Sequence, residues 1–266
     1  MNSTIFWEIP GQKVIKIKIL NIKIDNVDML KASARIVEFI ASDSPKSFLV
    51  VTPNSEIVVR AQKDHRLARI LNKADLAVPD GAGIVLASRI LAKKPLPERV
   101  AGFDLLLKLL SLAVQNNYRI YLLGGRPGIV ERARDRITAF YPGVNICGQY
   151  HGYLERQEQK KIISEINQLK PDLLFVGMGV PLQEKFLAQN LPLLKVKVAM
   201  TVGGSFDILA GEASRAPLWL QRANLEWFYR LLKEPARLER MLALPKFVYL
   251  IGKEFLGKYY GNYFNK

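Results

Sequence analysis

The chain has 266 residues, 49% of them apolar, and its 39 basic and 24 acidic side chains give a formal net charge of +15. The apolar fraction excludes a disordered chain, and the single cysteine, Cys147, excludes a disulfide-stapled scaffold and weakly favours a reducing compartment. Residues 1–20 lack the apolar stretch of a secretory signal, and no run of about 18 uncharged apolar residues occurs. We expect a soluble, cytoplasmic protein with an anionic partner: nucleic acid, anionic lipid or a phosphorylated substrate.

Short apolar runs alternate with longer stretches that carry helical spacing. The runs typical of strands are 47–52, 76–79, 118–123, 172–176 and 196–202. The segments typical of helices are 27–41, 55–72, 82–91, 102–116, 128–140, 156–169 and 182–190. Strands this short and apolar are usually covered on both faces. The pattern therefore predicts an α/β, Rossmann-like fold with a mostly parallel sheet, whose ligands bind beyond the carboxyl ends of the strands.

Polar and glycine-rich turns follow the predicted strands, at 52–54, 80–83, 124–127, 177–184 and 203–204. Glycine lets the backbone approach a ligand closely, and helix N-termini offer amide donors to phosphate. These turns together predict a nucleotide or phosphate site to which Gly124 and Gly125 contribute, although ordinary strand-to-helix turns also use glycine. Neither a complete G-x-G-x-x-G after the first strand nor a G-x-x-x-x-G-K-[ST] motif occurs, which disfavours dinucleotide-binding and P-loop proteins.

Two charged residues are candidates for chemistry at this edge. Asp80 precedes a glycine-rich turn and a predicted helix, where its carboxylate could act as a general base. Spacing alone favours the alternative, a helix cap or a turn-forming Asp-Gly pair. Arg99 could bind a diphosphate bidentately, or it could pair with Glu98 or Asp104 in its own loop. Asp104 is also placed to cap the helix that follows.

The remaining candidates are fewer. Gln183 could face a ligand, whereas Glu184 is expected to be structural because helix starts favour acidic residues. The sequence has no Asp-x-Asp, its histidines, His65 and His151, have no companion at ligand spacing, and no G-x-S-x-G occurs. Cys147 lies in a strand-like segment as an apolar filler. We therefore expect no metal, so that arginines and backbone amides would meet the charge of any diphosphate.

The composition changes near residue 215. The last 52 residues hold 11 of the 25 aromatic side chains, with 10 basic and 4 acidic ones. We predict a catalytic α/β domain over 1–214 and a helical appendage over 215–266, cut into short helices by Pro235 and Pro245. Its composition suits a membrane interface, nucleobase stacking or a hairpin packed on the core, and the density of aromatic residues favours the membrane.

Seven motifs in order resemble the WecG/TagA/CpsF family of bacterial glycosyltransferases (glycosyltransferase family 26), over roughly residues 17–240. They are Thr-Pro-Asn at 52–54, Asp-Gly-Ala-Gly at 80–83, Arg-Val-Ala-Gly-Phe-Asp at 99–104, Gly-Val-Pro-Leu-Gln-Glu at 179–184, Gly-Gly-Ser-Phe-Asp at 203–207, Arg-Ala-Pro at 215–217, and Leu-Glu-Trp at 225–227 running on to Glu-Pro-Ala-Arg at 234–237. The resemblance implies inverting, metal-independent sugar transfer from a UDP-sugar to a polyprenyl-diphosphate-linked saccharide. The best-known members add N-acetylmannosamine to lipid-linked N-acetylglucosamine in wall teichoic acid assembly.

The resemblance also implies roles for individual residues. Asp80 would deprotonate the acceptor hydroxyl, and Arg99 would steady the leaving UDP diphosphate. An appendage docked on the membrane would close over the site. The residues expected to hold the substrates, with Asp104 included, are Thr52, Asn54, Asp104, Gln183, Arg230, Arg237 and Arg240.

We therefore expect an enzyme without a cofactor, peripheral on the inner face of the bacterial membrane, that binds no nucleic acid. The rival from another class is a non-catalytic module that binds nucleic acid or membrane through its basic surface. An NAD-dependent oxidoreductase is disfavoured by the missing glycine fingerprint. The sequence leaves open the donor sugar, the acceptor sugar, the polymer and whether the chain forms a homo-oligomer.

Overall fold

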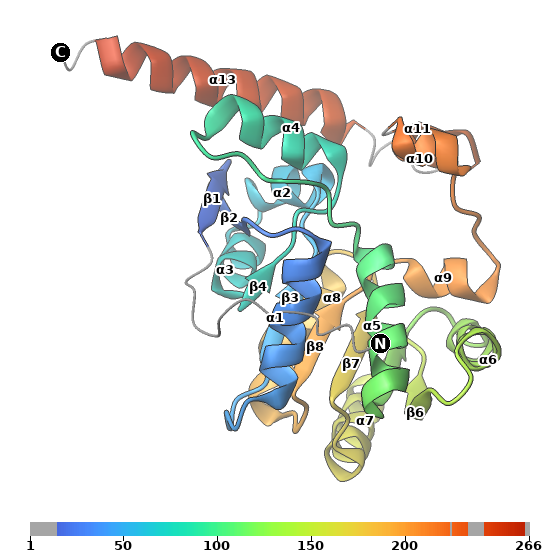
Figure 1. Cartoon of the computed structure of the whole chain (residues 1–266). Coiled ribbons are helices and arrows are strands. Elements are labelled where there is room, and N and C mark those ends of the chain that lie inside the picture. The colour runs from blue at the N-terminus through green and yellow to red at the C-terminus, as the bar shows by residue number, and fades with distance from the viewer. Residues whose placement is uncertain (1–14, 224, 234–241, 264–266) are drawn as a thin grey trace, which may run out of the picture.

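The computed structural model describes residues 15–223, 225–233 and 242–263 (Figure 1). Its centre is a six-stranded sheet in the order β4-β3-β8-β7-β5-β6, and every neighbouring pair is parallel. The strands are β3 (Phe48–Val51), β4 (Leu76–Ala77), β5 (Arg119–Gly124), β6 (Asn145–Tyr150), β7 (Leu173–Gly177) and β8 (Val198–Thr201). The predicted Rossmann-like α/β fold is confirmed, and the strand-like segment around Cys147 is β6.

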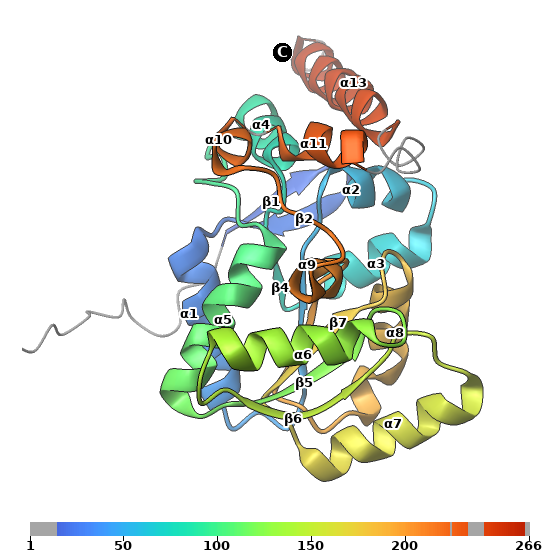
Figure 2. The same cartoon turned by 90° about the vertical axis from the view of Figure 1, so that its right-hand side faces the viewer.

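Helices cover both faces of the sheet (Figures 1 and 2). Because side chains alternate along a strand, Val50 and Leu122 face one core while Leu49 and Leu123 face the other. The first core is closed by α1 (Met29–Ala41), α5 (Gly102–Asn116), α6 (Ile129–Phe140) and α9 (Ser205–Ala210). The second is closed by α2 (Ser55–Ala61), α3 (His65–Lys73), α4 (Ala82–Leu91), α7 (Arg156–Leu169) and α8 (Leu182–Asn190).

The predicted helix over 55–72 is two helices, α2 and α3. The Asp64 side chain accepts a hydrogen bond from the Leu67 backbone N–H at 2.9 Å and so caps a new helix within the predicted one. Asn54 caps α2 in the same way, through Ile57 N–H at 3.0 Å. The apolar spacing continues across the break, which is why it predicted a single helix.

An antiparallel hairpin, β1 (Lys16–Ile19) and β2 (Ile22–Asp25), packs beside β4. Its last residue, Asp25, is buried, and its Oδ2 accepts the Ala77 backbone N–H at 2.7 Å and pairs with Lys16 Nζ at 3.1 Å. Burial raises the pKa of Asp25, and these two contacts oppose that rise. The hairpin thereby holds the strand that leads into Asp80.

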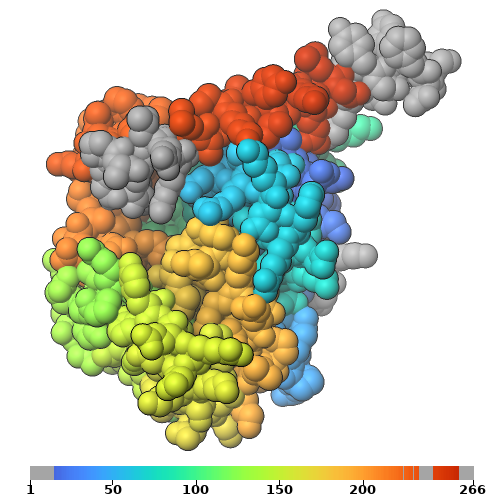
Figure 3. Space-filling model, turned by 180° about the vertical axis from the view of Figure 1, so that it is seen from behind, coloured from blue at the N-terminus to red at the C-terminus, as the bar shows by residue number. Residues whose placement is uncertain are grey.

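The C-terminal region forms α10 (Leu218–Arg222), α11 (Glu226–Lys233) and α13 (Ala243–Tyr263). Pro245 lies in the first turn of α13, where a missing N–H costs no helical bond, so the prediction that it ends a short helix is wrong. Pro235 lies outside the described residues. Phe247 and Ile251 of α13 are each only 4% exposed, against α2 and α4. The helix extends from there past the edge of the body (Figure 3).

Candidate active site

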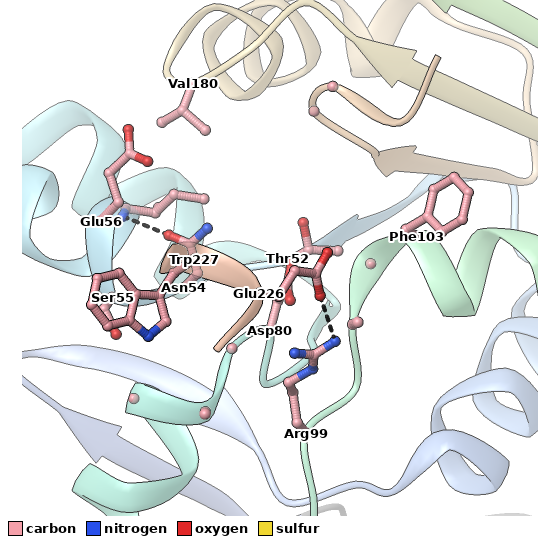
Figure 4. Close-up of a pocket in the computed structure, with 18 of the residues that line it drawn as sticks. Thr52, Asn54, Ser55, Glu56, Asp80, Arg99, Phe103, Val180, Glu226 and Trp227 are labelled. Carbon is pink, nitrogen blue, oxygen red and sulfur yellow. Dashed lines mark hydrogen bonds and ion pairs between the residues drawn. The ribbon is translucent and has the colours of Figure 1, made fainter. Parts of the chain in front are cut away.

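A cleft of about 460 Å³ lies between the carboxyl ends of the central strands and the C-terminal helices. Its floor comes from the segments after β3, β4 and β8 and from the start of α5, and α11 and α13 contribute the opposite wall. Its lining includes Thr52, Asn54, Asp80, Arg99, Phe103, Glu226 and Trp227 (Figure 4), together with Gln183, Arg215 and Phe247. The cleft thus lies at the edge of the sheet where ligands were predicted to bind.

Asp80 lies in this cleft because of the turn that follows β4. The backbone of Asp80 donates to Pro53 O at 3.2 Å, which ties the turn to the segment after β3. The next residue, Gly81, has φ +100, a conformation that glycine adopts without strain. Gly81, and not Asp80, is the N-cap of α4, so the helix-cap alternative does not describe the observed geometry.

Thr52 and Asn54 both line the cleft, as their predicted role requires. Thr52 is buried, and its Oγ1 lies 3.5 Å from Thr201 O. The Oδ1 atom of Asn54 is engaged in capping α2. A ligand would therefore meet the amide Nδ2 group of Asn54, which is a hydrogen-bond donor.

Arg99 extends from its loop toward the C-terminal helices. Its Nη2 lies 3.1 Å from Oε2 of Glu226, the first residue of α11 (Figure 4). Neither alternative partner within its own loop is used. Glu98 instead accepts the Met29 backbone N–H at 2.8 Å, and Asp104 binds another arginine.

That second arginine is Arg215, whose position near the cleft the sequence did not predict. Its Nη1 and Nη2 donate to the two carboxylate oxygens of Asp104 at 2.5 and 3.0 Å. Its guanidinium also lies 5.0 Å from the centre of the Phe103 ring. Asp104 is the third residue of α5 and does not serve as its N-cap, which is Ala101. The expected contact of Asp104 with substrate stays a prediction, and the structure shows it holding Arg215.

Gln183 occupies the position predicted for a pocket glutamine, at the start of α8. Its Oε1 accepts the Gly203 backbone N–H at 3.0 Å, and its Nε2 donates to Glu184 Oε1 at 2.8 Å. Both side chains are only 1% exposed. Burial raises the pKa of Glu184 to about 7, although the Gln183 hydrogen bond favours its charged form. Glu184 therefore orients the glutamine amide at the cost of a poorly solvated carboxyl group.

We expect the Glu184→Gln variant to remove a pH dependence of stability. The pKa of Glu184 is raised from 4.5 to about 7 in the folded protein, so folding takes up a proton between these values. Stability that is complete below pH 4.5 is therefore lost as the pH rises through about 7, by up to about 3 kcal/mol. Urea unfolding at pH 4.5, 6 and 8 measures this loss. An equal loss in the variant would contradict the assignment.

Gly124 and Gly125, predicted to bind substrate, are absent from the described lining of the cleft. A Cβ on Gly124 would collide with the backbone of Gly177 on the neighbouring strand, and Gly125 N–H donates to Gly177 O at 2.9 Å. A Cβ on Gly177 would in turn lie 2.8 Å from Gly203 O. Close packing of strand ends accounts for Gly124, and a Cβ on Gly125 would lie 2.9 Å from the Ile129 side chain of α6. The role of both glycines in binding stays a prediction.

The predicted appendage arginines are not placed by the structure. Arg230 belongs to α11, but its side chain is not described, and Arg237 and Arg240 lie outside the described residues. Sequence reasoning also assigned no role to Arg215, Glu226 or Trp227, which line the cleft. The signal was present, because all three belong to the motifs at 215–217 and 225–227.

The described residues contain no cluster of three or more His, Cys, Asp or Glu side chains able to hold a metal ion. Among their helices, none combines the length and apolar character needed to cross a bilayer.

A Rossmann-like sheet whose ligand edge carries an aspartate and two arginines in one cleft is the arrangement expected of an enzyme that binds its substrate beyond the carboxyl ends of the strands. The sequence model of the glycosyl transferase WecG/TagA/CpsF family matches residues 17–260, and the chain belongs to this family of glycosyltransferases. The predicted resemblance is confirmed, and the match extends further toward the C-terminus than the motifs indicated.

Curated relatives agree with the family assignment. The chain is 38% identical, over 77% of its length and 79% of the relative, to a Bacillus spizizenii protein named N-acetylglucosaminyldiphosphoundecaprenol N-acetyl-beta-D-mannosaminyltransferase. A Staphylococcus aureus protein of the same name is 35% identical over 90% of this chain and 92% of the relative.

Proposed function

We propose that this glycosyltransferase moves N-acetylmannosamine or a related hexose from a UDP-sugar to a polyprenyl-diphosphate-linked saccharide, with inversion and without a metal ion, in the synthesis of a cell-surface polysaccharide. The names of the relatives support the sugar and the lipid-linked acceptor. The observation that carries the proposal is that Asp80 and Arg99 line one cleft at the ligand edge of the sheet.

Asp80 acts as the general base in this mechanism. Its carboxylate takes the proton of the acceptor hydroxyl while that oxygen attacks the anomeric carbon from the face opposite UDP. The bond from the anomeric carbon to the diphosphate oxygen breaks as the new bond forms, so that a single displacement inverts the configuration. The products are the elongated lipid-linked saccharide, UDP and a protonated Asp80.

Arg99 meets the negative charge that develops on the departing diphosphate. A guanidinium offers paired N–H donors in the geometry of phosphate oxygens and stays charged at any working pH. The segment after β3 faces the sugar through Thr52 and Asn54, and the first turn of α8 faces it through Gln183. The fixed amide of Gln183 suits it to distinguishing sugar hydroxyl or acetamido groups.

The C-terminal helices bring the enzyme to its lipid-linked acceptor. Large apolar side chains are exposed on α10 and α13, among them Trp219 at 68% and Tyr249 at 69%. Rings of this kind settle among lipid headgroups, and nearby Lys and Arg side chains attract anionic lipid. We place the enzyme on the inner face of the membrane, where the polyprenyl diphosphate is anchored.

A panel of UDP-sugars with a short-chain polyprenyl-diphosphate N-acetylglucosamine acceptor tests this function, with products read by mass spectrometry. We expect transfer from UDP-N-acetylmannosamine or a close relative, at equal rates with and without EDTA, because protein groups meet the diphosphate charge. Loss of activity in EDTA would overturn the metal-free mechanism. Salt-sensitive binding of single-stranded nucleic acid, with no binding of any UDP-sugar, would favour the non-catalytic alternative.

A further inference from the structure

The carboxylate of Glu226 lies between two arginines of the cleft. One oxygen is 3.1 Å from Arg99 Nη2, and the other is 3.8 Å from Arg215 Nε. The Glu226 side chain is 12% exposed and both arginine side chains are 19% exposed, so water screens these charges only in part. Glu226 therefore occupies a partly buried anion site between the two arginines.

Arg215 is held so that one edge of its guanidinium remains for an anion. Asp104 takes both terminal nitrogens, and the Phe103 ring lies against the group. The Nε atom is buried and has no hydrogen-bond partner among the described residues, because 3.8 Å to Glu226 is too long for a hydrogen bond. A buried N–H without a partner is costly, and an acceptor closer than Glu226 would relieve that cost.

We propose that Arg215 is a second diphosphate-binding residue beside Arg99, and that Glu226 is a resident counter-ion which the diphosphate of the donor displaces. This inference rests on the proposed function, in which a nucleoside diphosphate sugar enters the cleft. Arg99, Arg215 and Glu226 all line that cleft. A diphosphate has two anionic groups, enough to engage both arginines at once, whereas the one carboxylate of Glu226 lies 3.1 Å from Arg99 and 3.8 Å from Arg215.

The exchange has a structural consequence because Glu226 begins α11. The next residue, Trp227, also lines the cleft. When a diphosphate takes the place of the Glu226 carboxylate, the first turn of α11 loses its ion pair with Arg99. Donor binding is thereby linked to the position of the helix that carries Trp227 over the site.

Titration calorimetry with UDP and with inorganic pyrophosphate tests the inference on the full chain. We expect Glu226→Gln to lower Kd for both probes by about threefold or more, because a competing charge is gone. We expect Arg215→Gln to raise both Kd values by about tenfold. Arg215→Lys keeps the positive charge but loses the paired N–H donors of the guanidinium, so its Kd values should lie between those of the wild type and Arg215→Gln. This variant provides the test if Arg215→Gln does not fold. The control is Glu212→Gln, which removes the same charge from an exposed pair with Arg132 and should change neither Kd.

The Kd values are expected to fall in Glu226→Gln and to rise in Arg215→Gln, and these opposite changes distinguish the inference from a merely structural ion pair. If Glu226 only anchors α11, Glu226→Gln lowers the melting temperature and leaves both Kd values unchanged or raised, and the inference is overturned. The wild-type protein could bind pyrophosphate but not UDP, with the variants changing the Kd for pyrophosphate by the expected factors. In that case the proposed donor is wrong and the two-arginine site stands. If the wild-type protein binds neither probe, both proposals fall.

Discussion

Replacing Asp80 with asparagine is expected to lower kcat by about 10²- to 10⁴-fold while the protein stays folded, because general-base catalysis contributes an acceleration of this size. The asparagine amide has the same shape and cannot accept the acceptor's proton. UDP binding should persist, since Arg99 and Arg215 are untouched. Steady-state transfer to the lipid-linked acceptor measures kcat, and UDP titration measures the affinity.

Glu56 provides a control within the same cleft. It lines the cleft from the first turn of α2, so Glu56→Gln removes one negative charge there without removing the proposed base. We expect a far smaller loss of kcat than in Asp80→Asn. A wild-type rate in Asp80→Asn, or equal losses in the two variants, would remove Asp80 from the mechanism.

Removal of residues 215–266 is expected to abolish transfer to the lipid-linked acceptor and to weaken binding to anionic vesicles. The deletion takes away Arg215, Glu226 and Trp227 from the cleft. It also uncovers the surface of α2 and α4 on which Phe247 packs. Vesicle flotation and acceptor assays report the two losses, and thermal unfolding shows whether the remaining domain is folded.

A double variant that keeps the buried residues of α13 separates membrane contact from folding. Trp219→Ser with Tyr249→Ser removes two exposed rings and leaves Phe247 and Ile251 buried. We expect weaker vesicle binding with unchanged UDP affinity, because neither ring lines the cleft. Phe140→Ser on α6, whose ring is also exposed, is the matched control and should bind vesicles like the wild type. Unchanged flotation of the double variant would favour a hairpin that merely packs on the core.

The parts of the site that sequence reasoning located share one physical cause. Thr52, Asn54 and Asp80 each follow an apolar strand, and the carboxyl ends of parallel strands meet at one edge. Short, wholly apolar runs bounded by turns were enough to predict a mostly parallel sheet that is covered on both faces. Gln183 was located by the same argument, from the turn after β7.

The ion pairs of the cleft could not be predicted in this way. Arg99 and Glu226 are 127 residues apart in sequence, and Arg215 and Asp104 are 111 apart. Their meeting depends on how loops and terminal helices settle on the finished sheet, which no local periodicity encodes. Pro245 was misjudged for a related reason, because proline breaks a helix or fits its first turn according to a start point that sequence patterns locate only within a few residues.

The close packing around Gly124, Gly177 and Gly203 limits how the sugar pocket of this chain can change. Gly124 and Gly177 leave no room for a side chain where neighbouring strand ends meet, and the Gly203 backbone N–H holds the Gln183 side chain. A methyl group on Gly124 or Gly177 would push the strand ends apart and move the glutamine amide, whichever sugar is bound. Substitutions that alter donor specificity can therefore be placed among the side chains around the sugar, whereas a larger residue at Gly124 or Gly177 would disturb the sheet edge itself.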